Sequence, residues 1–314
     1  MTKQHWLIFP VSVLLALGVA ACGDDDDDTG GGGDGGGVSG EIAIDGSSTV
    51  FPFAQAAAEQ FQTENPDVRI TVGQSGTGGG FEKFCAGETD ISDASRPIDE
   101  EEEVPLCEKA GVSYKELQVA SDGISVVTNP ALEVECLTTD ELKQVWESGS
   151  EVSSLSDVKP ELPDTELSLY GPGTDSGTFE FFTETINEEE GNTRKDYQPS
   201  EDDNVLVQGV TGDPGGLGYF GFSYYEANAD KLNLVALDAG NGCVEPSLEA
   251  IQSGEYEPLS RPIFMYPSEK ALQRPEVMAF MEFTLENADA IAEAAQIVPA
   301  SGEAIAESQA KLGG

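Results

Sequence analysis

Histidine is almost absent from this chain of 314 residues. The only one is His5, which precedes an apolar run in a stretch typical of a signal peptide. The mature chain therefore lacks the base of a Ser-His-Asp or Cys-His enzyme and the imidazole ligands of most transition-metal sites. No other motif calls for a metal or a cofactor, and we predict neither.

Basic residues are also scarce. The chain has 15 Lys and Arg against 59 Asp and Glu, which gives a formal net charge of −44. A chain of this charge offers no basic patch for nucleic acid, so a nucleic-acid partner is not expected. Salt screens the repulsion between surface carboxylates, so we hypothesise that the protein comes from a salt-rich habitat.

The N-terminal region has two parts with little capacity to fold. The apolar run of residues 6–21 is short for a membrane span and ends in small residues directly before Cys22. This arrangement resembles the lipobox of bacterial lipoproteins, so we predict a signal peptide over residues 1–21 and lipidation of Cys22. Residues 22–40 consist mainly of Asp and Gly, and we predict a disordered tether there.

Cysteine is limited to four residues after Cys22, namely Cys85, Cys107, Cys136 and Cys243. An even number in an exported chain indicates two disulfides, for which three pairings are possible. We favour Cys85–Cys107 with Cys136–Cys243, because each bond would then lie within one lobe of the fold proposed next. A zinc site is the competing interpretation, but these cysteines lack the CxxC spacing.

Strand and helix patterns alternate along the rest of the chain. Residues 41–66 read as a strand, a glycine turn and an amphipathic helix, and residues 68–98 repeat this order. Such alternation predicts an α/β fold with a mainly parallel sheet. We expect two lobes, between which the chain crosses twice. Residues 41–126 plus 261–314 would form lobe 1, and residues 127–260 would form lobe 2. The crossings would form a hinge beside a cleft.

Three strand-to-helix turns are unusually rich in Gly, Ser and Thr. They cover residues 46–49, 73–79 and 173–178, each at the carboxyl end of a predicted strand, where open α/β sheets place their ligands. Free backbone N–H groups at a helix N-terminus form an anion site. None of the turns matches a nucleotide-binding motif. Together they predict a small anion held from both lobes.

The motifs GSSTVFP, GQSGTGGGF, DISDASRPI, GPGTDSGTF and GGLGYFGFSYY occur in that order within residues 41–270. As a set they resemble the substrate-binding proteins of phosphate ABC transporters (PstS-like). The resemblance implies a two-lobed periplasmic-binding-protein fold of the type II kind, with phosphate as ligand and a membrane permease as partner. It also implies a binding protein rather than an enzyme. With the predicted lipid anchor, we expect a monomer on the outer face of the cytoplasmic membrane.

The resemblance also implies which residues bind the ligand. Hydroxyl and backbone donors are expected from Ser48, Thr49, Val50, Ser75, Thr77, Ser95, Ser176, Gly177 and Thr178. Arg96 is the only cation in these motifs and the expected bidentate partner of the oxyanion. The best-known members have Asp where this chain has Ser95, and Arg where it has Pro172. The residue that would accept a hydrogen bond from a proton on phosphate is therefore unassigned. Asp93 or Asp175 is expected to take that role.

Three alternatives remain open at this point. The first is a binder of another oxyanion, such as sulfate or molybdate, which ligand competition would distinguish. The second is a histidine-free hydrolase of phosphate esters with a Ser or Thr nucleophile. Such an enzyme needs an activating base, and no carboxylate cluster stands beside these turns in the sequence. The third is a structural or sensory lipoprotein that uses the same clamp.

Overall fold

The computed structural model of the protein describes residues 37–314. The predicted signal peptide, the lipidation of Cys22 and most of the predicted tether lie outside the described residues. Strand β1 begins at Gly40, where the predicted tether ends. In the described part of the chain, no helix combines the length and the apolar character that a membrane span requires.

Lobe 1 begins with three strands and three helices in alternation. They are β1 (Gly40–Gly46), α1 (Phe51–Glu64), β2 (Val68–Gln74), α2 (Gly76–Cys85), β3 (Ile91–Ala94) and α3 (Glu103–Ala110). Strand β1 pairs in parallel with both β2 and β3. Helix α1 buries Phe53, Ala57 and Phe61, which recur at helical spacing, against the sheet. Parallel strands end at the same edge, so the turns that follow them lie together.

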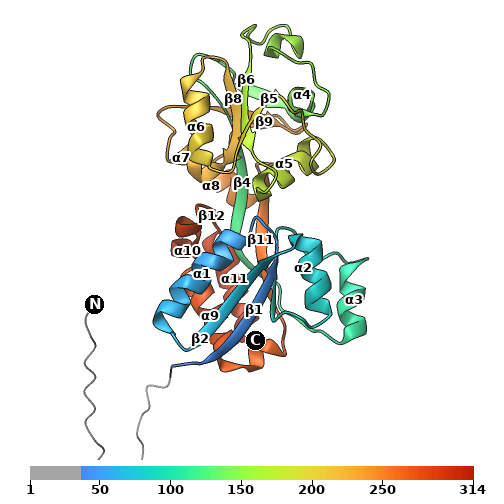
Figure 1. Cartoon of the computed structure of the whole chain (residues 1–314), viewed down its shortest axis with the longest axis vertical. Helices are drawn as coiled ribbons and strands as arrows, with labels where there is room; N and C mark the ends of the chain where they lie inside the picture. The colour runs from blue at the N-terminus through green and yellow to red at the C-terminus, as the bar shows by residue number, and fades with distance from the viewer. Residues whose placement is uncertain (1–36) are drawn as a thin grey trace, which may run out of the picture. The chain divides into compact units, whose positions relative to one another are not determined.

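Two long strands pass from one lobe to the other and form a stem, as Figure 1 shows. They are β4 (Leu117–Thr128) and β11 (Ser260–Pro267), and they pair antiparallel. In lobe 1, β11 also pairs with β3, and in lobe 2, β4 pairs with β8 (Gly216–Gly221). The predicted crossings fall on these strands. The boundaries predicted at residues 126 and 261 stay a prediction.

Lobe 2 is built between the two stem strands. Its other elements are β5 (Cys136–Thr138), α4 (Thr139–Trp146), the 3-10 turn η1 (Leu155–Asp157), β6 (Ser168–Pro172), α5 (Gly177–Ile186), β7 (Gln198–Ser200), α6 (Asp203–Gly212), α7 (Phe222–Glu226), β9 (Asn233–Asp238), β10 (Cys243–Val244) and α8 (Leu248–Ser253). Strand β6 pairs in parallel with β7 and β8. The core of lobe 2 centres on Trp146, Phe182 and Tyr219, whose rings pack against one another.

The chain returns along β11 to complete lobe 1. The last elements are the 3-10 turn η2 (Ala271–Gln273), α9 (Pro275–Glu286), α10 (Ala288–Ala295), β12 (Val298–Pro299) and α11 (Gly302–Gly313). Phe280 of α9 packs on Phe61 of α1 at 5.4 Å between ring centroids, so both ends of the described chain share one core. The two-lobed α/β fold is confirmed. The sheet is more mixed than expected, because the stem and its neighbours pair antiparallel.

Both disulfides form with the favoured pairing. Cys85, at the end of α2, is bonded to Cys107 on α3, and Cys136 of β5 is bonded to Cys243 of β10. The first bond lies in lobe 1 and the second in lobe 2. The second closes a span of 107 residues, which restricts the unfolded chain more strongly than the first, whose span is 22 residues.

Candidate functional site

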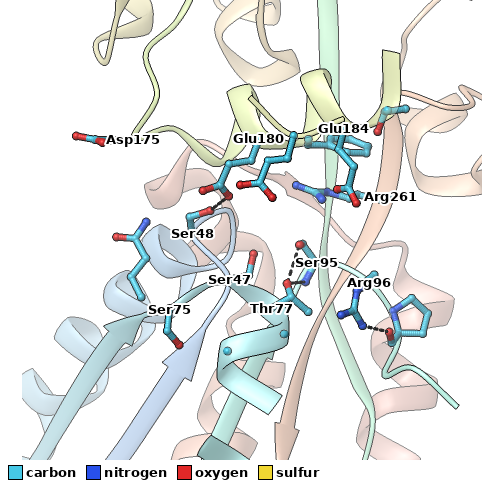
Figure 2. Close-up of a pocket in the computed structure, with 18 of the residues that line it drawn as sticks. Ser47, Ser48, Ser75, Thr77, Ser95, Arg96, Asp175, Glu180, Glu184 and Arg261 are labelled. Atoms are coloured by element: carbon cyan, nitrogen blue, oxygen red, sulfur yellow. Dashed lines mark hydrogen bonds between the residues drawn. The ribbon is translucent and has the colours of Figure 1, made fainter. Parts of the chain in front are cut away.

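A cleft of about 1030 Å³ opens between the lobes beside the stem. Its lobe 1 side is formed by the turn before α1, the start of α2 and the loop after β3, and its lobe 2 side by α5 and the loop before it. Strand β11 contributes to the same cleft. Figure 2 shows the polar side chains that point into it. The three Gly-, Ser- and Thr-rich turns are therefore brought together as predicted.

The turn before α1 presents unpaired backbone donors. In residues 37–314, the N–H groups of Ser48, Thr49 and Val50 donate to no protein acceptor, and α1 has no side-chain cap. Helix dipoles concentrate partial positive charge at such an end. Val50 is fully buried, so it offers only its backbone, whereas Ser47 and Ser48 line the cleft. This turn can hold an anion without any cation.

The start of α2 contributes less than the sequence implies. The Ser75 hydroxyl donates its hydrogen to the carboxylate of Asp45, so this hydrogen is not available to a ligand in the cleft. The same carboxylate also pairs with Lys83 at 2.7 Å. The Thr77 and Ser95 hydroxyls lie 3.0 Å apart, and the Thr77 oxygen also accepts from the backbone N–H of Ser95. One of these two hydroxyls retains a hydrogen for a ligand.

The start of α5 lies directly against the turn of α1. Ser176 caps α5, because its hydroxyl oxygen accepts from the backbone N–H of Thr178 at 3.2 Å. Gly177 faces Thr49 so closely that a Cβ at position 177 would lie 2.6 Å from the Thr49 backbone nitrogen. Two helix N-termini, one from each lobe, therefore meet at Thr49, and only glycine fits between them.

Arg261 is the cation at the centre of the cleft, and the sequence analysis missed it. Its side chain is 15% exposed and its Nε lies 3.3 Å from Asp122 Oδ2 across the stem strands. Its Nη2 donates to Thr49 Oγ1 at 2.7 Å, and its guanidinium stacks on the Phe181 ring at 3.7 Å. Burial lowers the pKa of Arg261, but an arginine remains charged. The one local signal that could have drawn attention to it is that Ser-Arg-Pro-Ile occurs both at 95–98 and at 260–263.

The expected role of Arg96 stays a prediction, although its fork has a protein partner in this structure. Arg96 lines the cleft, but its side chain is 47% exposed and both arms of its fork bind Glu103, each at 2.8 Å. This hydrogen bonding raises the pKa of Arg96. In this structure the bidentate partner of Arg96 is the carboxylate of Glu103 in the same lobe, and not an oxyanion. Glu103 lies on α3, is buried and needs a counter-charge.

Carboxylates also line the cleft, and those among its lining residues come from lobe 2. Glu180, in the first turn of α5, accepts a hydrogen bond from the Ser48 hydroxyl across the cleft, and Glu184 follows one turn later (Figure 2). Asp175 lines the cleft but is exposed, and Figure 2 shows it apart from Ser48 and Arg261. Its role as a proton-reading acceptor stays a prediction. Glu180 was not among the expected residues.

Asp93 is placed differently from its expected role. Its side chain lies within the sheet of lobe 1, is 1% exposed and does not line the cleft, and neither carboxyl oxygen has a hydrogen-bond partner. Burial, and secondarily the charge of Asp45, raises the pKa of Asp93 well above its ordinary value. A buried carboxyl with no partner avoids charge by holding its proton. In this conformation Asp93 cannot contact a ligand in the cleft.

Asp93 should make stability depend on pH. Above pH 3.8, its ordinary pKa, the unfolded chain loses this proton while the folded chain keeps it, so stability should fall as pH rises towards the folded-state pKa. Asp93→Asn should flatten this slope, because an amide is neutral without taking up a proton, and it should therefore raise the free energy of unfolding at pH 7. The gain should be limited to about 1 kcal/mol, because the buried amide is still an unpaired polar group. Urea unfolding between pH 4 and pH 8 measures both quantities. An unchanged slope in the variant would contradict this account.

No metal centre is formed in the part of the chain that the structure describes, because it contains no group of three or more His, Cys, Asp or Glu positioned to hold an ion. The chemistry of the cleft is instead that of free backbone donors at the start of α1, several hydroxyls and the guanidinium of Arg261, because the fork of Arg96 is occupied by Glu103. Two lobes joined by a two-stranded stem, with such a site between them, define a substrate-binding protein for a small anion.

Comparison with known proteins agrees with this class. A family model described as a PBP superfamily domain matches residues 33–288. Protein SphX of Synechococcus elongatus is 47% identical over 84% of this chain and 78% of that protein. The phosphate-binding protein PstS of Staphylococcus saprophyticus is 39% identical over 98% of this chain and 94% of that protein. A crystal structure of a possible phosphate binding protein from Planctomyces limnophilus, 47% identical, has a TM-score of 0.83 and covers 88% of this chain and 98% of that one. The chain belongs to the PBP superfamily and, within it, to the family of these PstS and SphX proteins.

Proposed function

We propose that the protein binds inorganic phosphate outside the cytoplasmic membrane and delivers it to the permease of a phosphate ABC transporter. One observation carries the choice of an anion: free N–H groups at the start of α1 meet the start of α5 at the cleft, beside the guanidinium of Arg261. The choice of phosphate is supported by the relatives that are named phosphate-binding proteins.

We assign the ligand contacts to both lobes. From lobe 1 they are the backbone N–H groups of residues 48–50, the Thr49 hydroxyl, and the Thr77 and Ser95 pair. From lobe 2 they are the N-terminal groups of α5 at residues 176–178. Arg261 replaces Arg96 as the cation, because its fork is less occupied and it lies at the junction of the lobes. A desolvated guanidinium forms stronger hydrogen bonds to an oxyanion than an exposed one.

The remaining parts of the proposal concern the setting of the protein. We propose that Cys22 carries a lipid that holds a monomer at the outer face of the membrane, and that the protein binds rather than transforms its ligand. The acidic composition does not oppose anion binding, since solvent screens the long-range field while hydrogen bonds in a closed cleft act at short range. Sulfate or molybdate is the alternative ligand, because the same donors fit any small tetrahedral oxyanion.

Calorimetric titration of the purified protein with phosphate, sulfate, molybdate and arsenate tests the proposal. We expect saturable binding of phosphate at one site per chain, and no release of phosphate from a generic phosphate ester in a turnover assay. Tighter binding of sulfate or molybdate than of phosphate would replace the proposed ligand. Steady turnover of the ester would replace the binding role with a hydrolytic one.

A further inference from the structure

The two arginines that line the cleft are held in different ways. Arg96 is held at its edge, because both arms of its fork donate to the carboxylate of Glu103. Arg261 is held at its face, because its guanidinium stacks on Phe181, with Cζ at 3.7 Å from the ring centroid. The N–H groups of a guanidinium lie in its plane and point outwards from its edge. A carboxylate therefore uses the donors that it holds, whereas a ring leaves them free.

The stacked guanidinium keeps most of its donors. Nε of Arg261 donates to Asp122 and Nη2 donates to the Thr49 hydroxyl, and no further acceptor of Arg261 is found within residues 37–314. An arginine has five N–H groups, so three remain after these two are used. They lie beside the turn before α1, because Thr49 belongs to that turn. The ring thus leaves a donor-rich edge where we propose that the anion binds.

Phe181 belongs to the helix that also touches the turn before α1. It lies on α5 about one helical turn after Gly177, which faces that turn. Both contacts are therefore made or lost together when lobe 2 moves. Glu180 and Glu184 of the same helix also attract Arg261, because their charges oppose the lowering of its pKa that burial causes. Figure 2 shows Glu184 beside Arg261.

We propose that Phe181 is a positioning residue for anion binding, whose ring holds the guanidinium of Arg261 with its free edge towards the ligand. This inference rests on the proposed function and adds a residue that acts on the ligand only through Arg261. Without the ring, Asp122 on the neighbouring stem strand would draw the N–H groups into a bidentate pair, as Glu103 does with Arg96. Because the ring moves with α5, the cation is fully presented only while the lobes are together.

Fluorine on the ring of Phe181 tests this role. Fluorine withdraws the negative charge of the ring face and hardly changes the shape of the ring, so it weakens the hold on a cation while the packing is kept. Phenylalanines carrying one, two or three ring fluorines are introduced at position 181, and phosphate affinity is measured by calorimetry. The affinity should fall with each added fluorine, by about tenfold in total. Phe181→Leu, which removes the ring, should weaken binding at least as much.

Phe179 is the matched control, because it is a buried phenylalanine of the same helix that does not line the cleft. Three fluorines at position 179 should leave phosphate affinity unchanged. The inference is overturned if the affinity does not fall as fluorine is added at position 181, or if the same fluorines at position 179 lower it as much. It is also overturned if Phe181→Leu binds phosphate like the parent. A parent that does not bind phosphate would instead overturn the proposed function.

Discussion

Arg261→Met should weaken phosphate binding by at least about 100-fold and lower the free energy of unfolding by about 3–5 kcal/mol. The binding loss follows from removing a guanidinium that is largely buried at the junction of the lobes and holds the Thr49 hydroxyl. The stability loss has a separate cause, because Asp122, 8% exposed, is left without its counter-charge. Calorimetry and urea unfolding measure the two effects independently.

A second substitution separates the two effects. Adding Asp122→Leu to Arg261→Met removes the uncompensated charge, so it should restore most of the stability but none of the binding. Arg96→Ala serves as the comparison, since it removes an arginine whose fork is already occupied by Glu103 and whose side chain is 47% exposed. Its effect on phosphate affinity should stay below about tenfold. A larger loss from Arg96→Ala than from Arg261→Met would return the central role to Arg96.

Gly177→Ala should weaken phosphate binding without destabilising the protein. The added Cβ would stand 2.6 Å from the Thr49 backbone nitrogen, so the start of α5 could no longer close onto the turn of α1. Overpacking of this kind costs roughly 2–3 kcal/mol, which corresponds to up to about 100-fold in the dissociation constant. The lobes can avoid the clash by staying apart, and Ala is a better helix former than Gly, so the melting temperature should hold or rise.

The control for this result is Gly212→Ala in the same lobe. Gly212 ends α6 and has nothing within 4 Å of the position of an added Cβ, so the affinity should not change, and the melting temperature should hold or rise as in Gly177→Ala. Scattering measurements with and without phosphate complete the test. The parent should contract on binding, whereas Gly177→Ala should contract less. A variant that binds phosphate like the parent would show that α5 and α1 do not need to approach this closely.

Local patterns in the sequence were sufficient for much of the architecture. The spacing of Phe53, Ala57 and Phe61 marked α1, and the glycine-rich turns marked the ends of strands, because both signals are set by neighbouring residues. The favoured pairing of the cysteines followed from assigning each to a lobe, and both bonds are present. Parallel strands then brought the turns to one edge of the sheet, which explains why three separate motifs predicted one cleft.

The charged residues of the cleft were less predictable, because their partners are distant in the sequence. Arg261 and Thr49 are 212 residues apart, and Ser48 and Glu180 are 132 apart. Nothing local distinguishes Arg96, which binds a carboxylate on the next helix, from Arg261. The direction of a hydroxyl hydrogen is likewise decided by its tertiary partners. The sequence therefore indicated where donors gather, while the fold decides which of them remain free.

We expect the paired strands of the stem to act as a hinge, so that closing the molecule on one side of the stem opens it on the other. Figure 1 shows α2 and α5 on one side of β4 and β11, and α8 and α10 on the other. On that second side a groove of about 580 Å³ lies between α8 and the last helices, bridged by a hydrogen bond from Gln252 to Pro299 at 2.8 Å. Bending of the stem that narrows the anion cleft should widen this groove. Spin labels at Leu248 and Ala290 should therefore move apart when phosphate binds, and would report closure from the side the ligand never touches.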